Sequence, residues 1–258
     1  MISKNRIKFI SSLRKRKARE ETGLYVIEGD KLVREFLESG IKLKILAAKP
    51  EFIGSLSDEK LHLAEEVDSV TNDELKHIST LTSPHNALAV VKRNDTAPDL
   101  TEILSTLTVA LDCIQDPGNL GTIIRASAWF GIKNIICSED SVDVYNPKVI
   151  QASMGAILHV SVVYKNLKEV LEEAKKRDLP VYGTMLEGRD LGSEKIKTDG
   201  ILVFGNESKG ISDELKPLIT KKILIPGAGS SKPGIESLNV GMAASIMLYE
   251  FTRKASHL

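Results

Sequence analysis

Strands and helices alternate through the second half of the chain, and no other feature of the sequence constrains the fold as strongly. Apolar runs at Leu107–Asp112 and Ile135–Cys137 flank an apolar helix predicted over Leu120–Phe130, and this pattern repeats toward the end of the chain. Strands joined through helices lie parallel, and strands buried on both faces read as continuous apolar runs. We therefore predict an α/β fold for residues 107–258, with a mostly parallel sheet and helices on both faces.

The first ninety residues are predicted to form a separate, small α/β domain. Short apolar strands alternate with amphipathic helices, the first helix over residues 4–18, and Asp30 is placed to cap a later helix. A polar stretch around Pro98 and Asp99 reads as a linker. We expect a domain over residues 1–96, a linker over 97–106 and a second domain over 107–258. The expected strands of the first domain are Gly23–Glu28, Ile41–Ala48 and Ala87–Lys92.

Composition excludes several classes of protein. Apolar residues make up 42% and charged residues 27% of the chain, which is typical of a folded, soluble domain and not of a disordered one. The apolar runs are too short to cross a bilayer, and the N-terminus has no apolar secretory core. Cys113 and Cys137 make neither a disulfide framework nor a zinc site, and the five histidines lack ligand spacing. We expect a cytoplasmic protein without a metal or a membrane partner.

A basic segment opens the chain, although its overall formal charge is zero. Residues 1–19 contain eight lysines and arginines and no acidic residue. Such a run is either a solvated face of a helix or a surface that binds phosphate, and charge alone does not decide between them. The basic residues are Lys4, Arg6, Lys8, Arg14, Lys15, Arg16, Lys17 and Arg19.

A first polar motif, Asn119–Arg125, lies at the start of the predicted helix that follows the strand Leu107–Asp112. Gly118 and Gly121 flank this start, where free backbone amides can hold an anion. Arg125 is either an exposed residue whose stem covers apolar surface or a contact for a bound anion. The motif by itself leaves both interpretations open.

Two further polar motifs follow later strands. Gly205–Gly210 comes directly after an apolar strand, so Glu207 would project from the carboxyl end, where open α/β sheets bind ligands. An ordinary polar loop is the alternative, and the residues after Gly210 exclude a P-loop. Ser237 and Asn239 either cap the last helix or belong to a site.

Taken together, the motifs resemble the SpoU/TrmH branch of the SPOUT methyltransferases. The resemblance rests on Asn119–Arg125, Gly205–Gly210 and Ile225–Asn239, with the segment Tyr145–Gly155 between them. The first domain is similar to the L30e-like substrate-binding domain of that family. The residues that carry this second similarity are Ser3-Lys-Asn, Lys15–Arg19 and Val26–Gly29.

The resemblance implies an enzyme that transfers methyl from S-adenosylmethionine to a ribose 2′-hydroxyl of RNA, releasing S-adenosylhomocysteine without a metal. It implies a trefoil knot in the catalytic domain, an exception to the rule against threaded chains. The implied substrate is 23S ribosomal RNA, with transfer RNA second, and the implied assembly is a homodimer. The closing helix Val240–Phe251 is apolar enough for that interface, or equally for plain core.

The resemblance also assigns residues. The catalytic positions are Arg125, Asn119, Glu207, Ser237 and Asn239. The cofactor-binding positions are Leu202, Gly205, Ile225, Pro226, Leu238 and Asn239. For RNA binding we expect Lys4, Arg14, Lys15, Arg16, Lys17, Arg19 and Arg125.

Arg125 is expected to act by charge. A guanidinium stays protonated in proteins, so we prefer a role in holding a phosphate and the developing alkoxide to one as a base. The chain departs from the family in a longer loop over residues 227–234 and in Gly241, where a serine often stands. The alternatives are a catalytically silent RNA-binding protein of this fold and a related enzyme that methylates a base.

Overall fold

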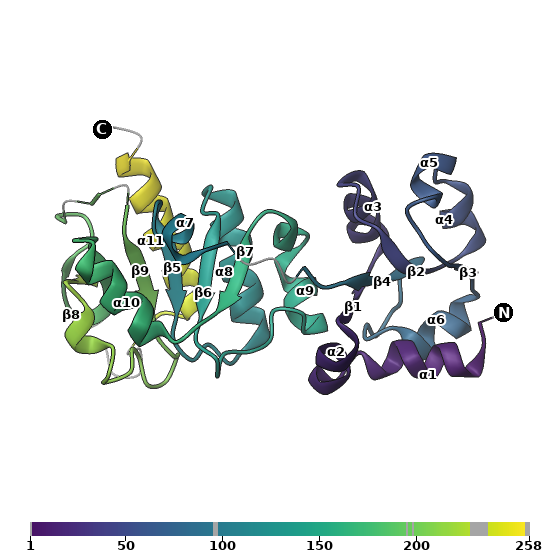
Figure 1. Ribbon diagram of the computed structural model, residues 1–258, viewed down its shortest axis with the longest axis horizontal. Coiled ribbons are helices and arrows are strands. Elements are labelled where there is room, and N and C mark those ends of the chain that lie inside the picture. Colours follow the sequence, from purple (N-terminus) through teal and green to yellow (C-terminus); the bar gives the residue numbers. More distant parts are fainter. Residues whose placement is uncertain (1, 95–97, 195, 198, 228–236, 256–258) are drawn as a thin grey trace. The chain divides into compact units, whose positions relative to one another are not determined.

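The computed structural model describes residues 2–94, 98–194, 196–197, 199–227 and 237–255, and it divides into two compact units (Figure 1). Unit 1 comprises residues 1–95 together with residues 143–155. Unit 2 comprises residues 96–142 and 156–258. A short piece of the second half of the sequence therefore folds with the first half.

Unit 1 is built on a four-stranded sheet in the order β1-β4-β2-β3. β4 (Ala87–Lys92) lies in the middle and pairs antiparallel with both β1 (Leu24–Glu28) and β2 (Leu43–Ala48). β3 (Val67–Ser69) adds to the other side of β2 in parallel. The three strands that the sequence predicts for this region are all present.

Helices surround this sheet, and two of them correct the sequence-based expectations. The single helix predicted over residues 4–18 is divided, because buried Leu13 ends the first helix and Lys15 is extended before the second. Asp30 is not a cap but the first residue of its helix, and its carboxylate accepts from the backbone N and Nδ2 of Asn86, at 2.8 and 2.6 Å. The helices are α1 (Lys4–Ser12), α2 (Arg16–Thr22), α3 (Asp30–Glu38), α4 (Pro50–Gly54), α5 (Asp58–Leu61), α6 (Asn72–Ile78) and α9 (Pro147–Ser153).

The segment 143–155 is fixed within unit 1 by polar and aromatic contacts. The Asp143 carboxylate accepts from Nη2 and Nε of Arg19, at 2.6 and 2.9 Å, and this arginine is only 2% exposed. Two residues further on, the ring of Tyr145 lies 4.6 Å from the ring of Tyr25. A buried ion pair and a ring contact therefore join this segment to α2 and β1.

Unit 2 contains a six-stranded sheet in the order β10-β8-β9-β5-β6-β7. Each of its paired strands runs parallel to its neighbour, which confirms the predicted sheet type. The trefoil knot stays a prediction. The strands are β5 (Thr108–Leu111), β6 (Asn134–Cys137), β7 (Ser161–Tyr164), β8 (Val181–Asp190), β9 (Ile201–Phe204) and β10 (Lys221–Leu224).

Helices cover both faces of this sheet, as predicted (Figure 1). On one face, α10 (Leu167–Lys176) and the short η2 (Lys216–Leu218) pack on alternate strand residues such as Ala110 and Val203. On the other face, α8 (Pro117–Trp129) packs against α11 (Val240–Ala255). There Phe251 of α11 meets the ring of Tyr182 edge-on, with 4.9 Å between the ring centroids.

Two short elements complete unit 2. The helix α7 (Leu100–Ile103) falls within residues 97–106, the stretch expected to be a linker, and its Ile103 is fully buried in the core beside α10. The turn η1 (Ala156–Leu158) precedes β7. Among the residues that the structure describes, no helix has the length and apolar character needed to cross a membrane.

Candidate active site

The three polar motifs follow elements that end at one edge of the sheet in unit 2. In a parallel sheet the carboxyl ends of the strands share an edge, and this edge is where α/β proteins bind ligands. β5 leads there into the start of α8, β9 into the turn Gly205–Gly210, and β10 into Ile225 and Pro226. Motifs that are about a hundred residues apart in the sequence therefore come together.

Three side chains, one from each motif region, form a continuous hydrogen-bonded chain. Asn239 Nδ2 donates to Asn119 Oδ1 at 2.8 Å, and Asn119 Nδ2 donates to Glu207 Oε1 at 2.5 Å. These residues come from the start of α11, the first turn of α8 and the turn after β9. The structure thus brings together three of the five residues that the resemblance assigns to catalysis.

Backbone groups fix the direction of the hydrogen bonds between Asn239, Asn119 and Glu207. Asn239 Oδ1 accepts from the amides of Gly241 and Met242, at 3.0 and 3.2 Å, so this residue caps α11 and turns its Nδ2 toward Asn119. The acceptor at the far end is a carboxylate, which suits an amide donor. The two interpretations of Asn239, as a helix cap and as a site residue, therefore hold for the same side chain.

The turn after β9 is held by Asn206, which the sequence motifs did not single out. Its Oδ1 accepts from the amides of Ser208 and Lys209, and its Nδ2 donates to the carbonyl of Cys113 at 2.9 Å. The Gly-Asn pair in the sequence could have indicated this role, because an asparagine side chain commonly accepts a hydrogen bond from the backbone two residues further on. Asn206 therefore sets the position from which Glu207 reaches Asn119.

Gly205 allows this turn to close on itself. A Cβ at this position would lie 2.1 Å from the carbonyl carbon of Gly210 and 2.2 Å from the amide nitrogen of Ile211. Both obstacles are backbone atoms, which cannot swing aside as a side chain can. The close approach of the two chain segments explains the glycine.

Replacing Gly205 by alanine should therefore disrupt the turn, release Glu207 from Asn119 and destabilise unit 2. We expect a loss of about 2–4 kcal/mol in the free energy of unfolding, because backbone must shift to admit the methyl group. Chemical unfolding followed by circular dichroism measures it. Gly54→Ala is a matched control, since nothing lies within 4 Å of a Cβ at that position. Equal stability of the two variants would contradict this account of the turn.

Arg125 lies outside the hydrogen-bonded chain. Its side chain is exposed on α8, and within the described part of the protein it makes no hydrogen bond or ion pair. Helical spacing places Thr122 and Trp129 on the same side of α8 as Arg125. An exposed guanidinium on the same helix as Asn119 is available to bind an anionic group. Ser237 is likewise exposed.

The residues expected to bind the cofactor divide into two groups. Gly205, Ile225, Pro226 and Leu238 lie at the ends of strands or at the start of α11; Pro226 and Leu238 are exposed, Ile225 is half-buried and Gly205 is buried. Leu202 is different, because it is fully buried in the middle of β9 with β5 and β8 paired on its two sides. Sheet pairing occupies its main chain, so the expected main-chain contact to a cofactor does not fit this position.

The chain departs from the family pattern in the loop 227–234 and at Gly241, and the structure describes only the second of these fully. Residues 228–236, which include most of the longer loop 227–234, lie outside the described residues. Gly241 lies where α11 approaches α8, and a Cβ there would be 3.1 Å from Cγ2 of Thr122. A small residue at position 241 thus permits the close contact of these helices beside the site.

The basic residues near the N-terminus are not equivalent. Lys4, Lys15 and Lys17 are exposed. Arg14 is exposed as well, but its Nη2 donates to the carbonyl of Ser79 at 2.7 Å. Arg16 forms an exposed ion pair with Glu20.

The position of Arg19 contradicts its assignment to RNA binding. Its guanidinium is buried, with Asp143 and the carbonyls of Leu13 and Arg14 as acceptors. An enclosed and paired guanidinium cannot reach a phosphate in solvent. Arg19 is therefore a structural residue of unit 1 and not an RNA contact.

Cys113, which follows β5 next to this edge, is not a nucleophile. It adopts a left-handed backbone conformation with φ of 56°. A hydrogen bond with the Asp140 carboxylate, together with partial burial, raises the pKa of its thiol to about 11. The thiol is therefore protonated at neutral pH, and only a thiolate would be reactive. No group of three or more potential metal ligands occurs among the described residues.

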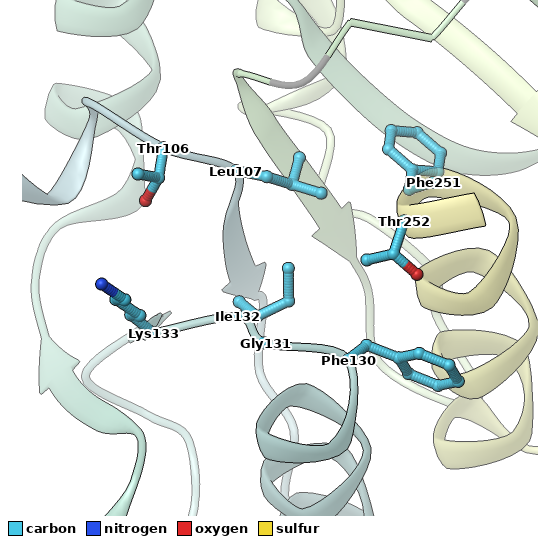
Figure 2. Close-up of a pocket in the computed structure, with 8 residues that line it drawn as sticks. All are labelled: Thr106, Leu107, Phe130, Gly131, Ile132, Lys133, Phe251 and Thr252. Atoms are coloured by element: carbon cyan, nitrogen blue, oxygen red, sulfur yellow. The ribbon is translucent and has the colours of Figure 1, made fainter. Parts of the chain in front are cut away.

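A shallow pocket in unit 2 lies away from the carboxyl edge. Figure 2 shows that Leu107, Ile132 and Phe251 form its apolar wall and that Lys133 lies near it. Leu107 directly precedes β5 and Lys133 directly precedes β6, so the pocket opens at the amino edge of the sheet. It is separate from the hydrogen-bonded chain of Glu207, Asn119 and Asn239.

Both parts of the chain match known families. Residues 106–249 match the SpoU rRNA methylase family, and residues 4–89 match an MRM3-like substrate-binding domain. The first match covers more than half of the sequence, so the chain belongs to the SpoU rRNA methylase family. The resemblance seen in the sequence motifs is thereby confirmed.

Individual relatives agree with this assignment over almost the whole chain. The 23S rRNA (guanosine(2553)-2′-O)-methyltransferase RlmP of Bacillus subtilis is 29% identical, over 95% of this chain and 94% of its own. A structure of a candidate TrmH-family RNA methyltransferase from Porphyromonas gingivalis is 38% identical, with a TM-score of 0.87 over 98% of this chain and 99% of its own. The AdoMet-bound rRNA methyltransferase from Sinorhizobium meliloti is 28% identical, with a TM-score of 0.85 over 98% and 97%.

Proposed function

We propose that this protein transfers methyl from S-adenosylmethionine to a ribose 2′-hydroxyl of 23S ribosomal RNA. The observation that carries the proposal is the chain Glu207–Asn119–Asn239, because it joins three family motifs at the ligand-binding edge of the sheet. The name of the RlmP relative specifies this reaction on 23S rRNA, which favours ribosomal RNA over transfer RNA. We place the reaction in the cytoplasm.

The residues at the carboxyl edge fit S-adenosylmethionine. Ile225, Pro226 and Leu238 offer apolar side chains for the adenine ring. Asn239, the residue after Leu238, donates through Nδ2 to Asn119. When bound, the cofactor supplies an electrophilic methyl group on a sulfonium.

The chain's own residues orient and activate the ribose. A hydroxyl must lose its proton as it attacks; that proton would pass to water, and Arg125 would stabilise the developing alkoxide or an adjacent phosphate by charge. Glu207 holds Asn119, which in turn holds Asn239, so the polar groups facing the ribose keep one orientation. Ser237, which directly precedes Leu238, is a second exposed polar group for the cofactor or the ribose. Orientation of the reacting groups can supply ~7–11 kcal/mol of the barrier reduction.

Transfer of labelled methyl tests this function. The full chain is incubated with radiolabelled S-adenosylmethionine and 23S rRNA that lacks modifications. We expect label in the RNA, whereas RNA binding without transfer would support a catalytically silent member of the fold. Transfer RNA serves as the competing substrate, and preferential labelling of it would move the assignment to tRNA.

Unit 1 is proposed to bind the RNA through its exposed cations. The match to a substrate-binding domain over residues 4–89 supports this role. Lys4, Lys15 and Lys17 are exposed, and Arg14 and Arg16 present part of their charge to solvent. Arg19 is left out because it is buried.

Replacing Arg14, Lys15, Arg16 and Lys17 by alanine should weaken RNA binding about 10- to 100-fold near physiological salt. Each lost phosphate contact should also reduce the slope of log K against log salt by about 0.7–0.9. Titration at several salt concentrations by fluorescence anisotropy measures both quantities. Lys133→Ala in unit 2 is the single-site control, and an unchanged salt slope in the quadruple variant would contradict the proposed surface.

A homodimer is proposed to form through the exposed apolar side of α8 and α11. Trp129 is 84% exposed and Met242 62%, and Ile246 and Tyr249 are 41% and 54% exposed. The inner side of α11 is core, since Met247 and Phe251 are buried. An exposed set of large apolar residues typically marks an interface with another protein. The interface would lie next to Arg125 on α8.

Replacing Trp129 and Ile246 by glutamate should therefore convert a dimer to a monomer. Each protomer then brings two charges into an apolar interface, which opposes association, and we expect at least a 100-fold weaker dimer. Light scattering after size exclusion reads the mass directly. Val67→Glu, at an exposed apolar residue of β3, is the control that should remain dimeric. A monomeric parent protein would overturn the proposal.

A further inference from the structure

Unit 1 contains a cavity that the proposed chemistry does not use. It measures about 360 Å³, within the range of ~300–1,000 Å³ that is usual for small-ligand pockets. Its wall comes from the junction of β1 and α3, from the loop before β4, and from α9 with its C-terminal turn. The lining residues are Glu28, Gly29, Asp30, Lys31, Leu32, Glu35, His85, Gln151 and Met154.

Two residues of the cavity wall have a positive φ. Gly29 has φ of 112°, which L side chains rarely adopt, and a Cβ there would point at Cδ2 of His85, 3.8 Å away. Met154 is in the left-handed region with φ of 50° and is half exposed. Met154 is the C-cap residue of α9, and the left-handed conformation is common at the ends of helices.

Two of the carboxylates in this wall already accept hydrogen bonds from other residues of the protein. Glu28 accepts from Ser79 Oγ at 2.5 Å and from the amide of Thr80 at 3.1 Å, and Asp30 accepts from Asn86. By contrast, the side chains of His85 and Gln151 make no hydrogen bond to any part of the chain that the structure describes. The free groups are thus an imidazole ring and a primary amide.

Charge selects the kind of ligand. Three carboxylates, those of Glu28, Asp30 and Glu35, line the cavity against one lysine, Lys31, so a phosphate would meet repulsion inside it. A neutral planar group would not be repelled by these carboxylates. The Gln151 amide can donate and accept at once, and an imidazole ring stacks on nucleobases. Met154 adds a polarisable apolar contact.

We infer that this cavity takes an unstacked nucleobase of the RNA substrate, with the phosphates outside and Lys31 near the mouth. The inference rests on the proposed function, which makes RNA the ligand of unit 1. Specific recognition of RNA mainly uses bases that are single-stranded and turned out of a stack. The cavity would therefore select a single-stranded stretch of the RNA.

Short single-stranded RNAs test the inference with the full chain. Binding of a decamer of adenosines and of an abasic decamer with the same phosphates is measured by competition. His85→Ala and Gln151→Ala should each weaken binding of the adenosine decamer about five- to tenfold and leave the abasic decamer unchanged. His85→Phe, which keeps a stacking ring, should restore binding, and His77→Ala is the control on an exposed histidine of α6.

Equal losses for both decamers would show a phosphate site and overturn the inference, as would unchanged binding in both alanine variants. Methyl transfer separates this result from the proposed function. In the RNA methylation assay the two variants should raise KM for 23S rRNA and leave kcat unchanged. If the parent protein transfers no methyl but the decamer difference persists, the cavity assignment stands and the proposed reaction fails.

Discussion

Replacing Arg125 by alanine should reduce the rate of methyl transfer about 100- to 1,000-fold. Removing one preorganised group that stabilises a developing oxyanion typically costs this much. The guanidinium is exposed on α8 and has no partner in the described part of the chain, so its removal should cost little stability. Single-turnover transfer of labelled methyl, at saturating RNA and cofactor, measures the chemical step.

Two companion measurements separate chemistry from binding. Arg125→Lys keeps the charge but loses the planar donor fork, so it should recover part of the rate. Thr122→Ala, one turn earlier on the same side of α8, is the structural control. A rate within threefold of the parent value for Arg125→Ala would remove the guanidinium from the mechanism.

Replacing Asp143 by alanine should destabilise unit 1 by about 3–5 kcal/mol. The Arg19 guanidinium donates to Asp143 Oδ2 through Nη2 and Nε, and the arginine is almost completely buried. Breaking a buried ion pair leaves an uncompensated charge in the interior, and costs of this size are typical. Urea unfolding, with far-ultraviolet circular dichroism as the signal, measures the free-energy change.

The matched control is an exposed ion pair on the same helix. Arg16 and Glu20 form such a pair, and Glu20→Gln should cost only about 0.3–0.5 kcal/mol. The double variant Arg19→Met with Asp143→Leu should recover most of the stability, because an apolar pair leaves no buried charge. A loss below about 1 kcal/mol for Asp143→Ala would show that the charge reaches solvent.

The sheet of unit 2 and its two helical layers could be predicted because β5, β6 and β9 are mostly apolar runs and because helices join β5 to β6 and β7 to β8. Parallel order then follows, and with it the shared carboxyl edge. Asn119, Glu207 and Asn239 were identifiable as polar residues directly after those strands or at the start of helices. The hydrogen bonds between them were not, since they depend on how α11 lies against α8.

Long-range packing decides the features that the sequence pattern could not give. In a run of cations, each side chain is expected to be exposed to solvent or to bind a phosphate. No local feature of the sequence distinguishes Arg19 from its neighbours. Its burial depends on Asp143, more than a hundred residues away in the sequence. The same holds for residues 143–155, which lie within the methylase match yet fold with unit 1. Leu202 fails as a main-chain ligand for a related reason, because strands β5 and β8 are both its neighbours.

The chemical position of the transferred methyl group tests the central claim most directly. RNA labelled by the full chain is digested with alkali, which cleaves after a free 2′-hydroxyl but not after a 2′-O-methyl ribose. We expect the label to stay in an alkali-resistant dinucleotide derived from 23S rRNA. Label released as a mononucleotide with a methylated base would contradict it.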